Sequence, residues 1–247
     1  MQLRLDGKQA VILGGSGGIG AATARLLAEA GAAVTLTYAR RREVAEELAA
    51  ALPGHGHAVR QALMEESATL DALAADVACR AGRCDLLVNA AGFTRAIPHR
   101  DLAALDDHFL DAMWRANWRG PFAAIRAFRP LLEESGGLIV NISSIAALDG
   151  SGSNLAYAAL KAATDSLTRS LARALAPRVR VMGIAPGVVE TGFVPGRGPE
   201  ENARIAATIP LRRVAAPEDV ARAVLALATL LTYSTGSTIL VDGGRAL

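Results

Sequence analysis

Short apolar runs alternate with longer alanine-rich stretches along the whole chain of 247 residues. The short runs predict seven strands, at residues 10–13, 33–38, 57–62, 85–89, 138–142, 179–184 and 238–241. The longer stretches predict helices at residues 19–30, 41–52, 69–81, 102–132, 154–175 and 218–231. Runs such as LIVNI at residues 138–142 do not alternate strictly between apolar and polar residues, as expected for strands covered on both faces. This pattern predicts an α/β fold: one Rossmann-type, doubly wound domain with a seven-stranded parallel sheet and helices on both faces.

No linker or internal repeat divides the chain, so residues 1–247 are expected to form one domain. Gly120 and Pro121 interrupt the fourth helical stretch and predict a bend there rather than a domain boundary. Residues 186–210 are irregular and rich in proline and glycine. Long irregular segments in compact domains are often lids or binding loops, so we expect a substrate loop here.

Composition excludes several classes of protein. Hydrophobic residues make up 51% of the chain and charged residues 20%, which excludes a disordered chain. No apolar run is long enough to span a membrane, and a net charge of +2 gives no support for a nucleic-acid partner. The first eight residues lack the apolar core of a signal peptide. Cys79 and Cys84 form neither a disulfide framework nor a metal pair, and the histidines show no ligand spacing, so we expect a cytoplasmic protein without a metal.

A glycine-rich turn, GGSGGIG at residues 14–20, joins the first predicted strand to the first predicted helix. Glycines let the backbone approach a pyrophosphate, and the helix N-terminus offers free N–H donors and a partial positive charge. A purely structural turn is the alternative. The strand before the motif and the helix after it favour a dinucleotide site.

Tyr157 and Lys161 lie four residues apart in a predicted helix and therefore share one face. A carbonyl reductase needs a proton donor, and a nearby ammonium together with an oxidised nicotinamide would lower the pKa of a phenol towards neutrality. Such pairs also occur by chance. However, the 26 basic residues include only two lysines, Lys8 and Lys161, and a planar guanidinium could not replace a compact ammonium in this position. Lys8 has no evident reason to be lysine.

The sequence YARRR at residues 38–42 ends the second predicted strand and has no carboxylate before Glu43. A carboxylate at this place would bind the ribose of NAD, whereas Arg40 and Arg41 can clamp the 2′-phosphate of NADP. The alternative is a solvated basic run at a helix start, with Tyr38 as a ribose contact. We expect NADP(H), with NAD(H) still possible.

Several of these motifs together resemble the short-chain dehydrogenase/reductase superfamily in its compact form. The spacing of Gly14, Gly18 and Gly20 is similar to its glycine motif, and NAAG at residues 89–92 is similar to its segment after the fourth strand. Asn117, Ser144 and Tyr157-x-x-x-Lys161 match its catalytic set. PG at residues 186–187, with Thr191, resembles its nicotinamide-side loop, and DGG at residues 242–244 its C-terminal end.

The resemblance implies roles for the catalytic set. Ser144 would hold the substrate carbonyl, although a serine that only satisfies backbone groups at a strand end is the alternative. Asn117 would hold a water that relays protons through Lys161 to Tyr157, although an exposed helix residue is the alternative. The expected cofactor contacts are Gly14, Ser16, Gly17, Gly18, Ile19, Gly20, Tyr38, Arg40, Arg41, Asn89, Ala90, Ala91, Gly92, Ile142, Tyr157, Lys161, Pro186, Gly187, Val189 and Thr191.

The chain departs from the family pattern at four positions. Leu13, Ala90 and Met182 replace a usual Thr and two usual Asn residues. Leu63 stands where an Asp commonly contacts the adenine, which puts that contact in doubt. The phosphate and nicotinamide ends of the site are unaffected.

The resemblance implies an oxidoreductase that interconverts a ketone and a secondary alcohol, similar to 3-oxoacyl-carrier-protein reductases. A non-catalytic NADP-binding regulator on the same fold is the alternative. The substrate would be a small carbonyl or alcohol compound, contacted by Phe93, Thr94 and residues 147–153 and 193–209, which show no charged clamp. Family members associate through their long helices, so a homotetramer or dimer is expected, and a stripe of Trp114, Trp118 and Phe122 is either core or a subunit contact.

Overall fold

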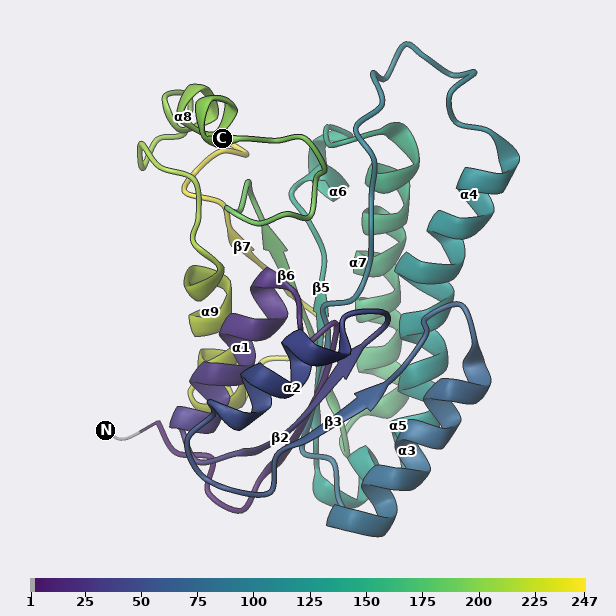
Figure 1. Cartoon of the computed structure of the whole chain (residues 1–247), viewed down its shortest axis with the longest axis vertical. Helices are drawn as coiled ribbons and strands as arrows, with labels where there is room; N and C mark the ends of the chain where they lie inside the picture. Colours follow the sequence, from purple (N-terminus) through teal and green to yellow (C-terminus); the bar gives the residue numbers. More distant parts are fainter. Residues whose placement is uncertain (1–2) are drawn as a thin grey trace.

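The computed structural model describes residues 3–247, which contain a single sheet of seven parallel strands in the order β3-β2-β1-β4-β5-β6-β7 (Figure 1). The strands are β1 (Gln9–Leu13), β2 (Ala33–Tyr38), β3 (Ala58–Gln61), β4 (Leu86–Asn89), β5 (Leu138–Ile142), β6 (Arg180–Pro186) and β7 (Thr238–Val241). The predicted fold class is confirmed. The strand order reverses between β1 and β4, so the carboxyl ends of these two strands border a crevice of the kind that binds ligands in doubly wound sheets.

Helices cover both faces of this sheet (Figure 1). They are α1 (Gly18–Glu29), α2 (Arg42–Ala50), α3 (Ser67–Ala81), α4 (Asp107–Trp114), α5 (Gly120–Ser135), α6 (Ala146–Asp149), α7 (Leu155–Leu175), α8 (Pro199–Ala206) and α9 (Pro217–Thr229). Helices α1 and α9 pack together on one face, and α3 packs against α5 on the other.

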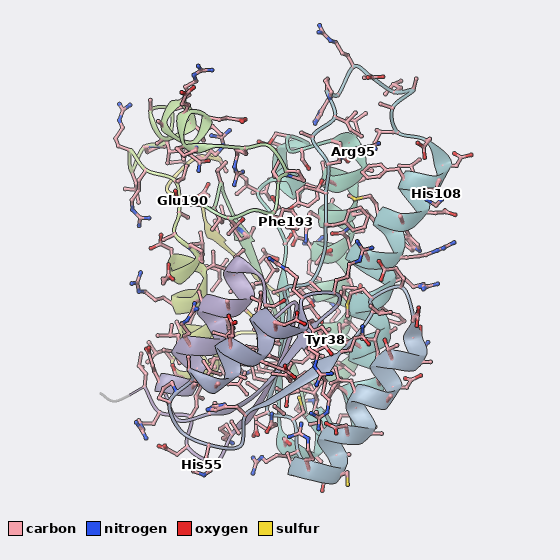
Figure 2. The ribbon with its side chains drawn as sticks, in the orientation of Figure 1. Tyr38, His55, Arg95, His108, Glu190 and Phe193 are labelled. Atoms are coloured by element: carbon pink, nitrogen blue, oxygen red, sulfur yellow. The ribbon has the colours of Figure 1, made fainter. Side chains whose placement is uncertain are left out.

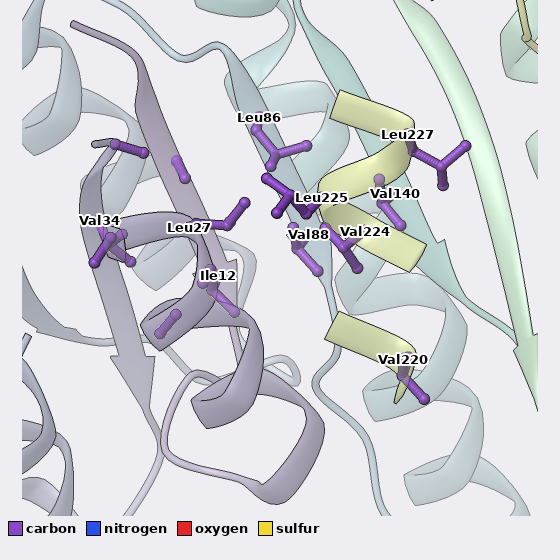
Figure 3. Packing of buried hydrophobic residues seen from close by; sticks show 14 of the residues in the cluster. Ile12, Leu27, Val34, Leu86, Val88, Val140, Val220, Val224, Leu225 and Leu227 are labelled. Carbon is purple, nitrogen blue, oxygen red and sulfur yellow. The ribbon is translucent and has the colours of Figure 1, made fainter. Parts of the chain in front are cut away.

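Successive residues of β1 enter two different cores, which explains why its apolar run is continuous. Ile12 lies among α1 and α9 residues such as Leu27 and Val224 (Figure 3). Val11 and Leu13 point to the opposite face, where they join the cluster that contains Phe128 of α5. Because side chains alternate along a strand, only an all-apolar run can fill both cores.

The fourth helical stretch is shorter and less regular than predicted. Residues 102–106 are not helical, because the side chain of Asp106 caps α4 by accepting a hydrogen bond from Phe109 N at 2.7 Å. Between α4 and α5, the five residues Arg115–Arg119 form a π-helical turn, η1. Pro121 has no N–H to continue the regular pattern, and Gly120 N donates five residues back to Arg115 O. The interruption expected at Gly120 and Pro121 is therefore a widened turn that begins at residue 115.

The predicted irregular loop at residues 186–210 contains a helix that the sequence analysis missed. Helix α8 begins with Pro199 at its first turn and has no buried residue. The short helix α6, after β5, was also missed. The ends of the other predicted strands and helices agree with the structure within two residues. Within residues 3–247 no helix is long and apolar enough to cross a membrane.

Candidate active site

A cleft of about 2050 Å³ opens at the carboxyl ends of the strands, between the glycine turn and the segment that follows β6. It is lined by Ser144 and by every predicted cofactor contact except Asn89. Of the predicted catalytic set, only Asn117 lies outside it. Asn89 and Asn117 instead line a small cavity of about 10 Å³ directly behind the cleft, and Lys161 borders both spaces. The structure thus brings the predicted site residues into one continuous region.

The glycine turn forms a cradle that larger residues would fill. Gly14 has a φ of +76°, and its amide donates a hydrogen bond to Thr37 Oγ1 at 3.0 Å. A Cβ at Gly20 would lie 2.2 Å from Gly14 O, and a Cβ at Gly18 would lie 2.4 Å from Thr191 Cγ2. No side chain caps α1, so its first N–H groups stay available. Close backbone approach and free donors at a helix N-terminus fit the pyrophosphate of a dinucleotide.

The rim of the cleft beyond β2 carries two arginines that form no ion pair with the described residues. Tyr38 is half-buried at the end of β2 (Figure 2), and Arg40 and Arg41 follow it as exposed side chains. Arg42 pairs with Glu46 at 2.8 Å, whereas within residues 3–247 neither Arg40 nor Arg41 has a carboxylate partner. Two guanidinium groups at the edge of the cleft are therefore free to bind an anion.

The adenine end of the cleft is apolar at Leu63. The backbone amide of Leu63 already donates to Thr69 Oγ1 at 3.0 Å, and its carbonyl accepts from the same hydroxyl at 3.1 Å. Leu63 therefore presents an apolar side chain to an adenine, and its backbone amide and carbonyl are already hydrogen-bonded to Thr69.

Tyr157 lies in the first turn of α7, where Asn154 fixes its position. Asn154 Oδ1 accepts a hydrogen bond from Tyr157 N at 2.8 Å, and its Nδ2 donates to Arg95 O at 2.8 Å. Burial raises the pKa of Tyr157 to about 12, while the Ser144 hydroxyl and the charge of Arg197 act to lower it. In the protein alone, burial therefore outweighs the lowering of the phenol pKa that we expected, and the phenol carries its proton at neutral pH.

Lys161 is buried one turn further along α7. Its ammonium donates to Ile142 O at 2.7 Å and lies 5.5 Å from the centre of the Tyr157 ring. Burial lowers the pKa of Lys161 to about 8, and the negative charge of Asp165, one more turn along, acts to raise it. The ammonium is thus charged at neutral pH but close to the point where it loses its proton.

Ser144 and Ser143 have different environments at the end of β5. The Ser143 hydroxyl is buried and donates to Lys161 O at 3.3 Å, so it is structural. The Ser144 hydroxyl lines the cleft and accepts a hydrogen bond from Ala146 N at 3.2 Å. Its own proton remains available to a ligand.

Asn117 lies in the π-helical turn and is buried, so the alternative of an exposed helix residue is wrong. Its Nδ2 donates to Phe93 O at 3.1 Å and to Met113 O at 3.0 Å, while its Oδ1 is buried without a partner in the described chain. The small cavity beside it reaches Lys161 and has room for about one water molecule. A water there would satisfy the orphaned oxygen.

The substrate end combines a predicted contact segment, residues 193–209, with positive charges that the sequence analysis missed. The Phe193 ring lies 5.9 Å from the Tyr157 ring, in the segment after β6 (Figure 2). Arg197 from the same segment and Arg245 near the C-terminus also line the cleft, which the sequence analysis had expected to lack charge. In sequence, Arg197 lies between Pro195-Gly196 and Gly198-Pro199, within the predicted substrate loop. Lys8, by contrast, has a structural role, because it pairs with Asp85 at 3.1 Å.

Within residues 3–247, no group of three or more His, Cys, Asp or Glu side chains could hold a metal ion. The polar side chains that line the cleft include hydroxyls, basic groups and three glutamates, Glu65, Glu66 and Glu201. This set of groups suits a dinucleotide and an organic substrate.

Comparison with known proteins places this geometry in a family. A family model described as enoyl-(acyl carrier protein) reductase matches residues 14–246. The chain is 35% identical to the 3-oxoacyl-(acyl-carrier-protein) reductase FabG of Aquifex aeolicus, over 99% of both chains. It is 38% identical to cis-4-hydroxycyclohexanecarboxylate dehydrogenase of Sinomonas cyclohexanicum, over 95% of both.

Solved structures agree. A short-chain dehydrogenase/reductase from Brucella melitensis superposes with a TM-score of 0.93 at 31% identity, covering 99% of both chains. A 3-ketoacyl-(acyl-carrier-protein) reductase from the same organism, complexed with NADH, gives a TM-score of 0.91 at 29% identity, covering 98% of this chain and all of the other. The chain belongs to the short-chain dehydrogenase/reductase superfamily of oxidoreductases and carries its NAD(P)(H) site.

Proposed function

We propose that this protein is an NADP(H)-dependent oxidoreductase that interconverts a ketone and a secondary alcohol, with Tyr157 as the proton donor and acceptor. The observation that carries the proposal is that Tyr157, Ser144 and Lys161 line one cleft together with Arg40 and Arg41. In the sheet, β1 and β4 separate β5, which Ser144 follows, from β2, which the two arginines follow. A regulator that only senses the coenzyme would need the glycine cradle but not this proton-transfer set.

In the reductive direction, Ser144 holds the carbonyl oxygen by donating a hydrogen bond. When bound, the nicotinamide supplies the hydride that reduces the carbonyl carbon. The phenol of Tyr157 donates its proton to the developing alkoxide, and a pKa of about 12 keeps that proton in place at neutral pH until the alkoxide forms. The Lys161 ammonium, below its pKa of about 8, stabilises the phenolate that remains.

The proton is replaced from the side of the cavity behind the cleft. Asn117 and Lys161 both border that cavity, and a water held there would connect the lysine with solvent. Asn117 positions this water, and Asn89 closes the same cavity through its hydrogen bond to Asn141 at 2.7 Å.

NADP(H) is favoured over NAD(H) by the charges at the rim. Arg40 and Arg41 are exposed beside the end of β2 and have no carboxylate partner within residues 3–247. In NAD-binding sites a carboxylate at the end of this strand would bind the 2′-hydroxyl of the ribose, and this chain has no carboxylate there. Two free guanidinium groups suit a 2′-phosphate, which they can bind in a bidentate way.

The aromatic stripe supports a homo-oligomer. Trp114, Trp118 and Phe122 stack in a row with ring centres 4.5 and 5.6 Å apart, and Trp114 is 43% exposed on α4. This surface suits a second copy of the chain, which would bury it. Light scattering coupled to gel filtration would give a dimer or tetramer, and Trp114→Glu would shift the mass towards the monomer. We also propose that the enzyme is cytoplasmic, because its two cysteines, Cys79 and Cys84, are both free, as suits a reducing compartment.

Absorbance at 340 nm tests the reaction directly. The protein is mixed with NADPH or NADH and a panel of small ketones, including an acetoacetyl thioester and cyclic ketones. We expect NADPH to be oxidised in the presence of at least one ketone. NADH should be oxidised more slowly with the same ketone. Tight NADPH binding without turnover of any ketone would favour the regulator.

A further inference from the structure

Two arginines lie at the substrate end of the cleft, far along the chain from each other. Arg197 belongs to the segment between β6 and α8, and Arg245 is followed only by Ala246 and Leu247. Figure 1 shows the C-terminus beside α8, which explains how these two segments meet. Both side chains line the same cleft as Ser144 and Tyr157.

Neither of these guanidinium groups is neutralised by direct contact. Within residues 3–247 neither forms an ion pair, whereas Arg213 and Arg222 nearby both pair with Asp219. Arg197 donates from Nη2 to Val189 O, which fixes the guanidinium, but its Nε is buried without a partner among the described residues. Arg245 makes only a long contact of 3.5 Å to Thr208 Oγ1.

The two arginines also repel one another. Partial burial is the main cause that lowers the pKa of Arg197, the charge of Glu201 acts to raise it, and the charge of Arg245 acts to lower it. Glu201 and Asp149 are close enough to offset some of this charge, but both are exposed and neither contacts a guanidinium. Arg197 is half-buried and Arg245 is exposed, so a ligand that brings a negative charge would chiefly offset the desolvation of Arg197.

We propose that Arg197 and Arg245 form a subsite for an anionic group on the substrate, a carboxylate or a phosphate, so that the enzyme prefers anionic ketones to neutral ones. This proposal rests on the proposed ketone–alcohol function and adds the substrate class. The planar fork of arginine matches both anions. The subsite lies close enough to Tyr157 for the charge of Arg197 to act on the phenol, so the anion and the reacting carbonyl would belong to one small molecule.

Matched substrate pairs test the subsite. The first pair is 4-oxopentanoate and its methyl ester, and the second is dihydroxyacetone phosphate and dihydroxyacetone. Each is assayed with NADPH on the wild type and on Arg197→Gln, Arg245→Gln and Arg204→Gln. Arg204 is an exposed arginine of α8 that does not line the cleft, so its variant is a control for the loss of one charge.

We expect the wild type to prefer the anionic member of at least one pair by about tenfold or more in kcat/KM, as a charge-assisted contact allows. The first pair identifies a carboxylate and the second a phosphate. Arg197→Gln and Arg245→Gln should lower the anion-to-neutral ratio by about the same factor, and Arg204→Gln should leave it unchanged. A ratio near one or below in the wild type for both pairs, or a ratio that these two variants do not change, would overturn the subsite.

Failure of the subsite can be told apart from failure of the proposed function. Turnover of the neutral ketones without any anion preference would leave the proposed function intact and reject the subsite. If no ketone is turned over, calorimetric titration of 4-oxopentanoate and of dihydroxyacetone phosphate into the NADP-bound protein still decides. Binding that weakens in Arg197→Gln and Arg245→Gln supports the subsite, and no binding, or binding equal in all variants, rejects it.

Discussion

Replacing Arg40 and Arg41 with alanine should weaken NADPH binding and leave NADH binding nearly unchanged. Both guanidinium groups line the rim of the cleft without a carboxylate partner in the described chain, so both are available to a 2′-phosphate. A charged hydrogen bond contributes about 1.5–3 kcal/mol when shielded, and solvent reduces this at an exposed rim. We therefore take about half of the lower value for each arginine, about 1.4 kcal/mol for the pair, which is a tenfold loss of NADPH affinity.

The measurement is a pair of fluorescence titrations, with NADPH and with NADH, on the wild type and the double variant. Arg42→Ala is the matched control, because Arg42 is the next arginine in the run but is already paired with Glu46. Raising the salt concentration should weaken NADPH binding more than NADH binding in the wild type and equally in the double variant. A wild type that prefers NADH, or a double variant that loses both coenzymes equally, would refute this reasoning and direct attention to Tyr38 as a ribose contact.

Three further predictions follow from the cradle, the α7 cap and the buried lysine. Gly17→Ser should be tolerated, because its Cβ would lie 3.4 Å from the nearest atom. Gly20→Ala should abolish coenzyme binding, because its Cβ would lie 2.2 Å from the backbone of the turn. Thermal melts with and without NADPH distinguish the two variants. Asn154→Ala should lower the free energy of unfolding by about 2 kcal/mol, which corresponds to a fall of about 4–8 °C in Tm. Asn154→Asp should retain the cap, so its Tm should fall less. Calorimetry measures both changes. The rate of ketone reduction should be constant below the Lys161 pKa of about 8 and fall as pH rises through it, because the charged ammonium is the active form; a rate that rises with pH from 7 to 9 would contradict its role.

The sheet could be predicted from sequence because the strands are short, most are apolar on both faces, and each of the first six is followed by a helix. In β1, for example, Val11 and Ile12 face different cores, and no other pattern of residues would fill both. The glycine cradle could be predicted because its constraint lies within a short stretch of sequence. A Cβ at Gly20 would clash with the backbone of its own turn, and this constraint is local.

The features that the sequence analysis missed depend on contacts between distant segments. Helix α8 is only eight residues long and buries none of them, and the surrounding proline and glycine masked it. The π-helical turn at Arg115–Arg119 arises from the missing N–H of Pro121, which predicts an irregularity without giving its form. Arg197 and Arg245 meet only because the C-terminus folds back beside α8.

The sequence could not predict whether burial or nearby charge dominates the pKa of the Tyr157 phenol. The spacing of Tyr157 and Lys161 predicts that they share a helix face, and they do. How far each is buried depends on the whole fold, and burial sets both pKa values here. The phenol is therefore held as a proton donor rather than poised as a base.

The central claim is that Tyr157 transfers the proton, and stopped-flow measurement on Tyr157→Phe tests it most directly. The protein with bound NADPH is mixed with the best ketone of the panel, and the single-turnover rate of NADPH oxidation is compared with the wild type. Since the phenol lines the substrate side of the cleft and the phenylalanine ring fills nearly the same space, NADPH affinity should stay within a few-fold. We predict a fall in rate of about a hundredfold or more, as expected for loss of a general acid. A variant that keeps more than about a tenth of the wild-type rate, a barrier change below about 1.4 kcal/mol, would contradict the account.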